Sequence, residues 1–299
     1  MVGIVILNYK VWQETEKCVQ SIYETVKEPF KIYIVDNHSP NDSFQRLQEL
    51  YRDRKEIVCM QTSDNGGFSK GNNAGIKACE ADGIEYAVVS NSDIIFGEGC
   101  IDGLYRIMKK YPNTVQAAPG VLNPNGEAMS LPWKGRQSML QYLRLKSSQK
   151  LLVTEKEARL RKVYMVSGGC FIVNVKLFAK MGYFDENIFL YNEESIFSAR
   201  AVEAGYDIMF DNRITVIHNH GASTEKGTLF VDAEVLKSGL YYWKHYEQTS
   251  DCGLVFIYLI MTLRMTLKVL LGRVRSKGYG RYRKECFKAL KRVLRERTV

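Results

Sequence analysis

Proline is scarce in this sequence, with 6 residues in 299, and the chain has no low-complexity tract and no internal repeat. These absences argue against long linkers and against repeat architectures. The seven cysteines form no C-x-x-C pair and no Cys/His cluster with zinc spacing, which predicts free thiols in a reducing compartment. The remaining composition fits one large globular domain, or one domain with an appendage.

A secretion signal is also missing from the first ten residues, MVGIVILNYK. No basic region precedes their short apolar run, and no small-residue cleavage site follows it. We therefore interpret this stretch as a first β-strand and expect the chain to work in the cytosol.

Net positive charge is confined to one end of the chain. The formal net charge is +9, and from Arg273 onward eleven Lys and Arg residues accompany two Glu. Acidic and basic residues cancel over 1–272, so any anionic partner implied by charge is a partner of this tail.

The first hundred residues alternate between apolar runs and helical spacing. Strands are predicted at 2–7, 31–35, 57–61 and 87–90, and helices at 13–26, 43–51 and 72–80. Apolar strands separated by helices are typical of a buried parallel sheet with helices on both faces. Ligands of such sheets bind outside the carboxyl ends of the strands, which is where four polar residues fall: Asn8, Asp36, Asn65 and Asp93.

The second half of the chain continues the pattern less regularly. Residues 163–173 predict one strand with a double glycine, Gly168-Gly169, where another group approaches the backbone closely. Helices are predicted at 176–181 and 194–204, and a last strand at 214–218. The polar, irregular region 122–160 predicts a mobile loop over a site.

A glycine-rich loop, DNGGFSKGNN at 64–73, leads into the third predicted helix. Backbone N–H groups in such a loop can cradle a phosphate at a helix N-terminus. The loop is neither a G-x-G-x-x-G fingerprint nor a P-loop, because Lys70 precedes Gly71 and no Ser or Thr follows a Gly-Lys pair. A tight turn between strand and helix is the alternative explanation of the glycines.

A single carboxylate, Asp93, ends the polar stretch Ser90-Asn91-Ser92 after the fourth strand. Mg²⁺ keeps several waters and needs only one or two protein carboxylates together with substrate phosphate oxygens. Asp93 is therefore a candidate ligand for a cation that binds a substrate diphosphate, and Asn91 could add a carbonyl. A helix or turn cap is the alternative role for Asp93.

Two adjacent acids, Glu193 and Glu194, stand at the start of the helix predicted around 194–204. Favourable interaction with the helix dipole is one explanation for them. The functional interpretation is that one carboxylate points into a cleft as a general base whose pKa is raised by burial. Downstream, His218 and His220 end the last predicted strand, where an imidazole suits metal ligation or a structural role.

Seven stretches follow one another in a recognisable order over about residues 1–246. They are VILNY, IVDNHS at 34–39, NGGFSKGNNAGI at 65–76, SNSD at 90–93, SGGCFIVNVKLFAKMGYFDENIFLYNEES at 167–195, HNHGAS at 218–223 and KSGLYYWKHY at 237–246. Their order resembles that of family 2 inverting glycosyltransferases with the GT-A fold, in particular the bacterial rhamnosyltransferase-like branch. The resemblance implies an α/β fold with a Rossmann-like, mostly parallel sheet flanked by helices.

The resemblance also implies a role for each candidate residue. Asn8 and Asp36 would contact the nucleoside of the donor, and the loop would hold its ribose and diphosphate through Asn65, Gly67, Phe68, Gly71 and Asn72. Asn91 and Ser92 are assigned to the donor as well. Asp93, at the last position of the D-x-D motif, and His218 would bind Mn²⁺ or Mg²⁺. Glu194 would deprotonate the acceptor hydroxyl, with Glu193 contacting the acceptor or supporting Glu194.

The sequence departs from the family pattern at two positions. Asn91 stands where the first acid of D-x-D is expected, which lowers the charge of the metal site. Relatives commonly carry a second acid two residues beyond the position of Glu194, and here that residue is Ile196. A site with one carboxylate still suffices if His218 and the substrate diphosphate complete the ligand shell.

The C-terminal segment reads differently from the rest. The stretch 252–271 is strongly apolar, but only 252–263 run uncharged, too few residues to span a bilayer unaided. Followed by RYRKECFKALKRVLRER, it predicts basic amphipathic helices lying in an anionic membrane interface. A nucleic-acid-binding tail and an oligomerisation helix are the alternatives. Nucleic acid would not need the apolar run, so we expect no nucleic acid partner and leave a homodimer open.

Together these interpretations predict a transferase domain over 1–246 and a membrane-association segment over 247–299. Within the first, the nucleotide-sugar half covers about 1–120 and the acceptor half about 121–246. The expected reaction moves a sugar, with rhamnose from dTDP-rhamnose as the best candidate, to a lipid-linked glycan at the cytoplasmic face of the plasma membrane. UDP-hexose and galactofuranose donors, a nucleotidyltransferase on a similar sheet, and an inactive scaffold that binds glycans or membranes are the alternatives.

Overall fold

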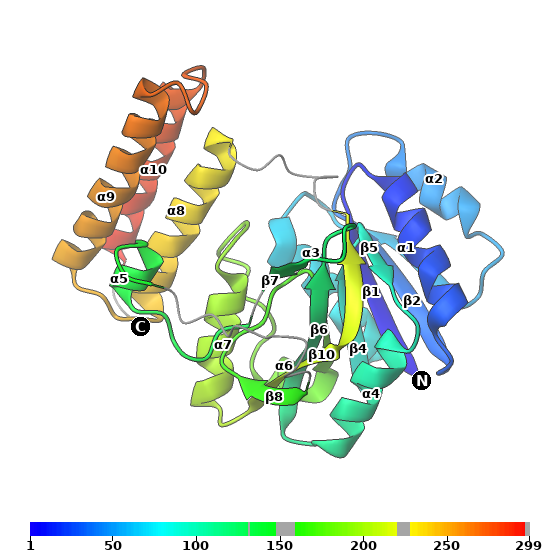
Figure 1. Cartoon of the computed structure of the whole chain (residues 1–299). Coiled ribbons are helices and arrows are strands. Elements are labelled where there is room, and N and C mark those ends of the chain that lie inside the picture. Colours follow the sequence, from blue (N-terminus) through cyan, green and yellow to red (C-terminus); the bar gives the residue numbers. More distant parts are fainter. Residues whose placement is uncertain (131, 148–158, 220–227, 297–299) are drawn as a thin grey trace.

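A mixed β-sheet frames the protein in the computed structural model, which describes residues 1–130, 132–147, 159–219 and 228–296 (Figure 1). Its strands follow the order β3 (Ile57–Gln61), β2 (Phe30–Asp36), β1 (Val2–Asn8), β4 (Tyr86–Asn91), β9 (Cys170–Asn174), β6 (Thr114–Leu122), β10 (Asp207–His218) and β5 (Ile94–Phe96). Two more strands lie beside this path: β7 (Ala128–Ser130) pairs with β6, and β8 (Leu160–Val163) pairs with β10.

The first four strands pair in parallel, as the sequence predicts. Between them run the helices α1 (Trp12–Thr25), α2 (Ser43–Leu50) and α3 (Gly67–Ala81). The register places Asn8 beside Asp36 and Leu7 beside Asn91, so the carboxyl ends of β1, β2 and β4 meet. We call this side of the sheet the carboxyl edge.

The second half of the sheet is mixed, and here one expectation is wrong. Strand β9 runs antiparallel to β4 and β6, whereas β10 runs parallel to β6 and antiparallel to β5 and β8. The single strand expected at 163–173 is two strands, because β8 pairs with β10 while β9 lies between β4 and β6. Residues 164–169 connect these two places and carry the double glycine. Strand β10 also begins earlier than expected, with a register shift between Asp211 and Thr215 that breaks its apolar pattern.

Two apolar cores lie on the two faces of the sheet, which confirms the expected helices on both sides. One core joins inward side chains of β1 and β2 to Cys18 and Ile22 of α1 and to Leu104 of α4 (Cys100–Lys110). The other joins Val5 and Tyr33 to Ile76 of α3, together with α6 (Val175–Lys180) and α7 (Glu193–Glu203). All seven cysteines are free thiols, as predicted.

The region 122–160 contains ordered elements. These are β7 and the short helix α5 (Met139–Tyr142), whose N-cap Ser138 forms a capping box with Gln141. Residues 131 and 148–158 lie outside the described residues, so the mobile loop expected over 122–160 stays a prediction.

Three helices complete the chain: α8 (Leu229–His245), α9 (Asp251–Leu270) and α10 (Tyr279–Arg295). They form a third apolar core that joins Leu236 and Leu240 of α8 to Leu254, Ile257, Leu290 and Val293. Figure 1 shows α8 running away from the carboxyl edge and α9 returning, so the α9–α10 turn and the carboxyl edge lie at the same end of the molecule. Within the described residues, α9 is the one helix long and apolar enough to cross a membrane, by length and composition only.

Candidate active site

Asn8 and Asp36 end β1 and β2 and lie side by side. Asn8 donates its amide N–H to Asp36 Oδ2 at 2.6 Å, and Thr15 donates its hydroxyl to Asn8 Oδ1 at 2.9 Å. Ser39 and Gln61 donate further hydrogen bonds to the Asp36 carboxylate. Neither Asn8 nor Asp36 has exposed surface, so their contact with a nucleoside stays a prediction. In the structure they tie the carboxyl ends of β1 and β2 together.

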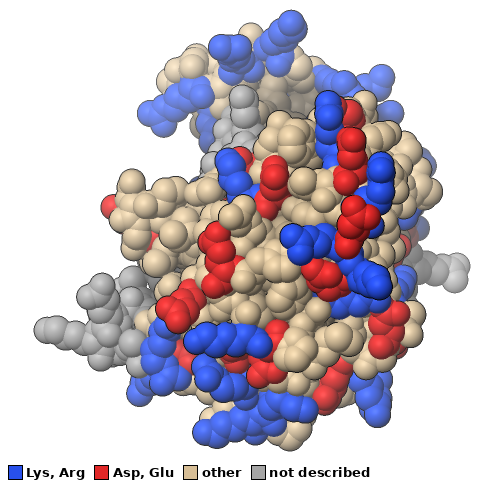
Figure 2. All heavy atoms as spheres, turned by 90° about the vertical axis from the view of Figure 1, so that its right-hand side faces the viewer, with Lys and Arg blue, Asp and Glu red and all other residues tan. Residues whose placement is uncertain are grey.

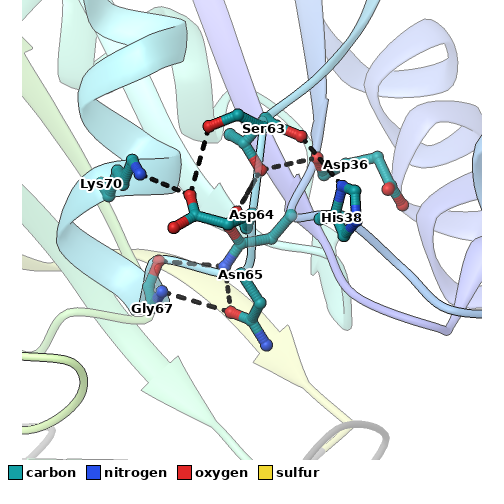
Figure 3. A network of polar contacts seen from close by, with 9 residues as sticks. Asp36, His38, Ser63, Asp64, Asn65, Gly67 and Lys70 are labelled. Carbon is teal, nitrogen blue, oxygen red and sulfur yellow. Dashed lines mark hydrogen bonds and ion pairs between the residues drawn. The ribbon is translucent and has the colours of Figure 1, made fainter.

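The glycine-rich loop is fixed by hydrogen bonds at the start of α3 (Figure 3). Asn65 Oδ1 accepts hydrogen bonds from Asn37 Nδ2 at 2.9 Å and from the Gly67 amide at 3.2 Å. The Phe68 amide donates to the Phe189 carbonyl at 3.0 Å. Two of the first N–H groups of α3 therefore already have protein partners, which favours the strand–helix turn as the role of this loop.

Close approach explains the glycines of this helix. Gly67 has φ of +81°, and a Cβ there would lie 1.9 Å from the Phe189 carbonyl oxygen. A Cβ at Gly71 would lie 2.4 Å from Leu7. Helix α3 thus begins earlier than the predicted residue 72 because glycine lets it pack directly on β1. The predicted donor contacts of Gly67, Phe68, Gly71 and Asn72 are not tested by these packing contacts and stay predictions.

Asp93 and His218 are brought together by the pairing of β5 with β10, in which Ile94 lies opposite His218. His218 Nε2 lies 3.0 Å from Asp93 Oδ1, and both side chains are buried. The two residues predicted from the sequence as metal ligands therefore lie within hydrogen-bond distance of each other. His220 lies outside the described residues.

The double glycine lies between this pair and Asn91. The Asn91 amide donates to the Gly169 carbonyl at 3.0 Å. A Cβ at Gly169 would lie 3.5 Å from the His218 ring and 3.9 Å from Asn91 Nδ2. These are ordinary contact distances, so the close approach predicted for the double glycine is not found at Gly169 but at Gly168, where a Cβ would lie 2.8 Å from a Glu194 oxygen. Ser92, in the turn between β4 and β5, is buried.

Glu194 contacts the other glycine of the pair. The Gly168 amide donates to Glu194 Oε1 at 3.0 Å, and a Cβ at position 168 would lie 2.8 Å from that oxygen. Helix α7 starts after two residues with left-handed backbone, Tyr191 at φ 69° and Asn192 at φ 65°. Such backbone is unfavourable for Tyr191, whereas asparagine adopts it more readily than other non-glycine residues.

Burial raises the pKa of both glutamates. For Glu193 the pKa is raised well above its ordinary value, with the neighbouring Glu194 adding to the effect of burial. Burial also raises the pKa of Glu194, but the Gly168 amide acts in the opposite direction. Glu193 Oε2 is buried without a hydrogen-bond partner among the described residues. Of the two, Glu194 is the one that accepts a hydrogen bond from the Gly168 amide, and this contact favours its charged form.

A cavity of about 540 Å³ lies elsewhere, between α4 and the first half of β10. Its lining includes Arg106, Lys110 and Arg213, and Arg213 is already paired with Asp211. None of the site residues described above lines it.

Comparison with known proteins decides the family. Residues 3–182, more than half of the chain, match the family described as glycosyl transferase family 2. The chain belongs to this family.

Two relatives of this glycosyltransferase have specific names. The low-salt glycan biosynthesis hexosyltransferase Agl10 of Haloferax volcanii is 25% identical over 218 residues, 73% of this chain and 66% of that protein. An N-acetylglucosaminyl-diphospho-decaprenol L-rhamnosyltransferase of Mycobacterium tuberculosis is 24% identical over 238 residues, 74% of this chain and 76% of that protein. The chain spans slightly less than two thirds of the Haloferax protein.

Solved structures show the same fold. GalNAc-T7 with UDP, GalNAc and Mn²⁺ has a TM-score of 0.64 at 14% identity, over 83% of this chain and 49% of that chain. The mannosyltransferase PcManGT of Pyrobaculum calidifontis, in complex with GDP-Man and Mn²⁺, has a TM-score of 0.58 at 10% identity, over 98% of this chain and 87% of that chain. The glycosyltransferase therefore has the GT-A fold, as the sequence predicts.

The residues of this glycosyltransferase fit a divalent cation only if its substrate supplies ligands. No group of three or more His, Cys, Asp or Glu side chains that could hold a metal occurs in the described part of the chain. Asp93 and His218 offer one carboxylate and one imidazole at a shared position. Mg²⁺ or Mn²⁺ that takes its remaining ligands from a diphosphate and water needs no more from the protein. The pair fits such a cation.

Two positioning residues have no such role in the sequence interpretation, where Asn37 is unassigned and Asn73 is only the last residue of the loop expected to hold the donor. Asn37 holds Asn65 and the Gly67 carbonyl, and Asn73 bonds both the N–H and the carbonyl of Phe184. Each directly follows a residue that was recognised, so its position beside a motif was the available signal.

Proposed function

We propose that this glycosyltransferase moves a sugar from a nucleoside diphosphate donor to a hydroxyl of a lipid-linked glycan, inverting the anomeric carbon. Rhamnose from dTDP-rhamnose is the first candidate. The mycobacterial relative, named as a rhamnosyltransferase acting on a decaprenol-linked sugar, supports both sugar and acceptor. The single observation that carries the proposal is Glu194, fixed by Gly168 next to the glycine that contacts His218 and Asn91.

In this proposal Glu194 is the general base. Its carboxylate takes the proton of the acceptor hydroxyl as the acceptor oxygen bonds to the anomeric carbon. The bond between that carbon and the donor diphosphate breaks, and the nucleoside diphosphate leaves with the electron pair. Asp93 and His218 would hold Mn²⁺ or Mg²⁺, which when bound neutralises charge on the leaving diphosphate. Glu193, its neighbour at the start of α7, supports Glu194 or contacts the acceptor.

A hexose is the second candidate sugar. The Haloferax relative is named as a hexosyltransferase at an identity similar to that of the rhamnosyltransferase, so UDP-hexose and galactofuranose donors stay in the comparison. The proposed place of work is the cytoplasmic face of the plasma membrane, with peripheral attachment through the C-terminal helices.

A thermal-shift panel of sugar nucleotides, with and without Mn²⁺ or Mg²⁺, tests donor and cation together. A donor at about 100 times its Kd stabilises the protein by roughly 2.7 kcal/mol. We expect dTDP-rhamnose to raise Tm by several degrees only when the metal is present. Asp93→Ala should lose this shift, while Asp53→Ala, which removes an exposed carboxylate far from the site, should keep it.

The transfer reaction is then followed directly. Release of dTDP that depends on a lipid-linked acceptor supports transfer, and Glu194→Gln should slow it by roughly 100-fold or more. A protein that binds no nucleotide but retains glycan or membrane binding would contradict the proposal and favour the scaffold.

A further inference from the structure

Helix α9 carries an exposed row of large apolar side chains. Leu259, Leu263 and Leu267 are 55%, 55% and 48% exposed, and Leu270 is 74% exposed. With Phe256 and Leu271 they follow helical spacing on one side of α9, whereas Leu254, Ile257 and Met265 face the bundle core. We call Phe256, Leu259, Leu263, Leu267, Leu270 and Leu271 the apolar stripe. Soluble surfaces rarely expose such a contiguous apolar set without a partner.

Positive charge gathers where the apolar stripe ends. The connection after α9 and the first turns of α10 expose six cations, Arg273, Arg275, Lys277, Arg281, Arg283 and Lys284, which we call the basic turn. Figure 2 shows Lys and Arg gathered at the top of the molecule, the end where Figure 1 places the α9–α10 turn. Acidic and basic residues cancel over 1–272, so the net charge of +9 belongs to 273–299, and the basic turn carries six of the eleven cations of that segment.

A chain of contacts connects the basic turn to the active site. Lys268 pairs with Asp232 near the start of α8, and Gly278 approaches Leu229. The Phe230 ring lies 6.4 Å from the Phe189 ring. The Phe189 carbonyl in turn accepts a hydrogen bond from the backbone N–H of Phe68 in the glycine-rich loop. The basic turn therefore lies on the same side of the molecule as the carboxyl edge.

We infer that the apolar stripe and the basic turn dock on an anionic lipid bilayer and orient the carboxyl edge toward that bilayer. The inference rests on the proposed lipid-linked acceptor, whose sugar must reach Glu194 while its lipid stays in the membrane. Charge favours a membrane over a second copy of this chain as the binding partner. Lipid phosphates are complementary to the basic turn, whereas a second copy would place another basic turn against it. The apolar stripe inserts between headgroups as the turn contacts them.

Vesicle co-sedimentation of the full-length protein tests the surface without using activity. The probes are vesicles of phosphatidylcholine alone and of phosphatidylcholine mixed equally with phosphatidylglycerol. We expect the protein to bind the mixed vesicles at least ten times more tightly. Arg273→Glu with Arg275→Glu should weaken this binding at least ten-fold, and so should Leu270→Ser with Leu271→Ser. The matched controls, Arg52→Glu with Lys55→Glu and Leu50→Ser, change exposed residues of the sheet domain and should bind as the wild type does.

Activity assays keep the two proposals apart. The docking variants should lose at least ten-fold in transfer to an acceptor embedded in vesicles and keep transfer to a short, water-soluble acceptor. If the wild-type protein transfers sugar but does not bind the mixed vesicles, the membrane-docking proposal is wrong and the proposed function is unaffected. Vesicle binding without any transfer overturns the proposed function instead. A dimer that Leu270→Ser with Leu271→Ser dissociates, in a protein that ignores vesicles, would assign the apolar stripe to a second copy.

Discussion

Gly168 controls how closely the backbone of 164–169 approaches the proposed base. Its amide holds Glu194 Oε1 at 3.0 Å, and an added Cβ would lie 2.8 Å from the same oxygen. We expect Gly168→Ala to displace the carboxylate and lower kcat by roughly 100-fold, because small displacements of a reacting group are costly. KM for the donor should change little. Steady-state kinetics with donor and acceptor varied separately measures both.

Gly280→Ala is the matched control for this substitution. Nothing lies within 4 Å of a Cβ at that position, and alanine favours the helix in which it lies. Its kinetics should equal those of the wild type. A Gly168→Ala enzyme with unchanged kcat would show that Glu194 does not need this hydrogen bond.

The two buried glutamates differ in the role we expect of them, because the Gly168 amide holds Glu194 and not Glu193. Burial raises the pKa of Glu194, so the base becomes protonated, and kcat/KM falls, at a pH above about 4.3, the ordinary value of a glutamate. Glu194→Gln should lower kcat by roughly 100- to 10,000-fold. Glu193→Gln changes the glutamate that the Gly168 amide does not hold and should keep most activity with the same acid limb. A pH–rate profile of both variants checks the assignment, and the reverse result would make Glu193 the base.

At the scale of elements, the first half of the sheet was predictable because its signals are local. Continuous apolar runs give β1 to β4, and helical spacing gives α1 to α3. The start of α3 at Gly67 was not predictable, since glycine disfavours helices and only contacts with Leu7 and Phe189 compensate. The separation of β8 from β9 depends on which strands each one joins, and such pairing is decided by residues far apart in sequence.

The candidate site shows the same division. No local pattern pairs Asp93 with His218, because 125 residues separate them and the pairing of β5 with β10 brings them together. The order of the motifs predicts both residues as metal ligands. The short distance between their side chains is known only from the fold. The hydrogen bond from Gly168 to Glu194 was foreseen only as a close approach to an unspecified group.

Asp185 connects the segment before α7 to the end of α8. It accepts hydrogen bonds from the hydroxyls of Tyr246 at 2.6 Å and Tyr241 at 2.9 Å, and from the Asn187 amide at 2.9 Å. Burial acts to raise the pKa of Asp185, but these donors outweigh it and hold the pKa below its ordinary value. The stability that they supply is present above pH 4, and it is lost as pH falls through the lowered pKa.

We therefore expect Tyr246→Phe to lower the free energy of unfolding by about 1.5–3 kcal/mol at neutral pH, the usual worth of a hydrogen bond to a charged group. Thermal unfolding measures the change, and the difference from wild type should shrink as pH falls below about 3.9, the ordinary value of an aspartate. Tyr258→Phe makes the same change in α9, where the hydroxyl forms no hydrogen bond among the described residues, and should have little effect. An equal decrease in the free energy of unfolding for both variants would show that the hydrogen bond to Asp185 contributes nothing specific to stability.

At the scale of the molecule, the third core crosses the boundary that the sequence places after Tyr246. Leu236, Leu240 and Trp243 of α8 are buried against side chains of α9 and α10. The helices that carry the proposed membrane surface are therefore also the helices that cover α8. Sheet domain and bundle share apolar surface, so the orientation of one fixes the orientation of the other.

Truncation after Tyr246 tests this coupling. Removing α9 and α10 strips the cover from α8, and each large apolar side chain so exposed costs about 1.5–3 kcal/mol. A whole domain is stable by only about 5–15 kcal/mol, so we expect the 1–246 fragment to aggregate or to unfold well below the full chain. Solubility on expression, size-exclusion chromatography and thermal unfolding measure the outcome. The full-length protein with Leu270→Ser and Leu271→Ser is the control, because it alters the exposed stripe and leaves the core intact. A soluble monomeric fragment with the Tm of the full chain would mean that 247–299 is a separable appendage, as the sequence alone suggests.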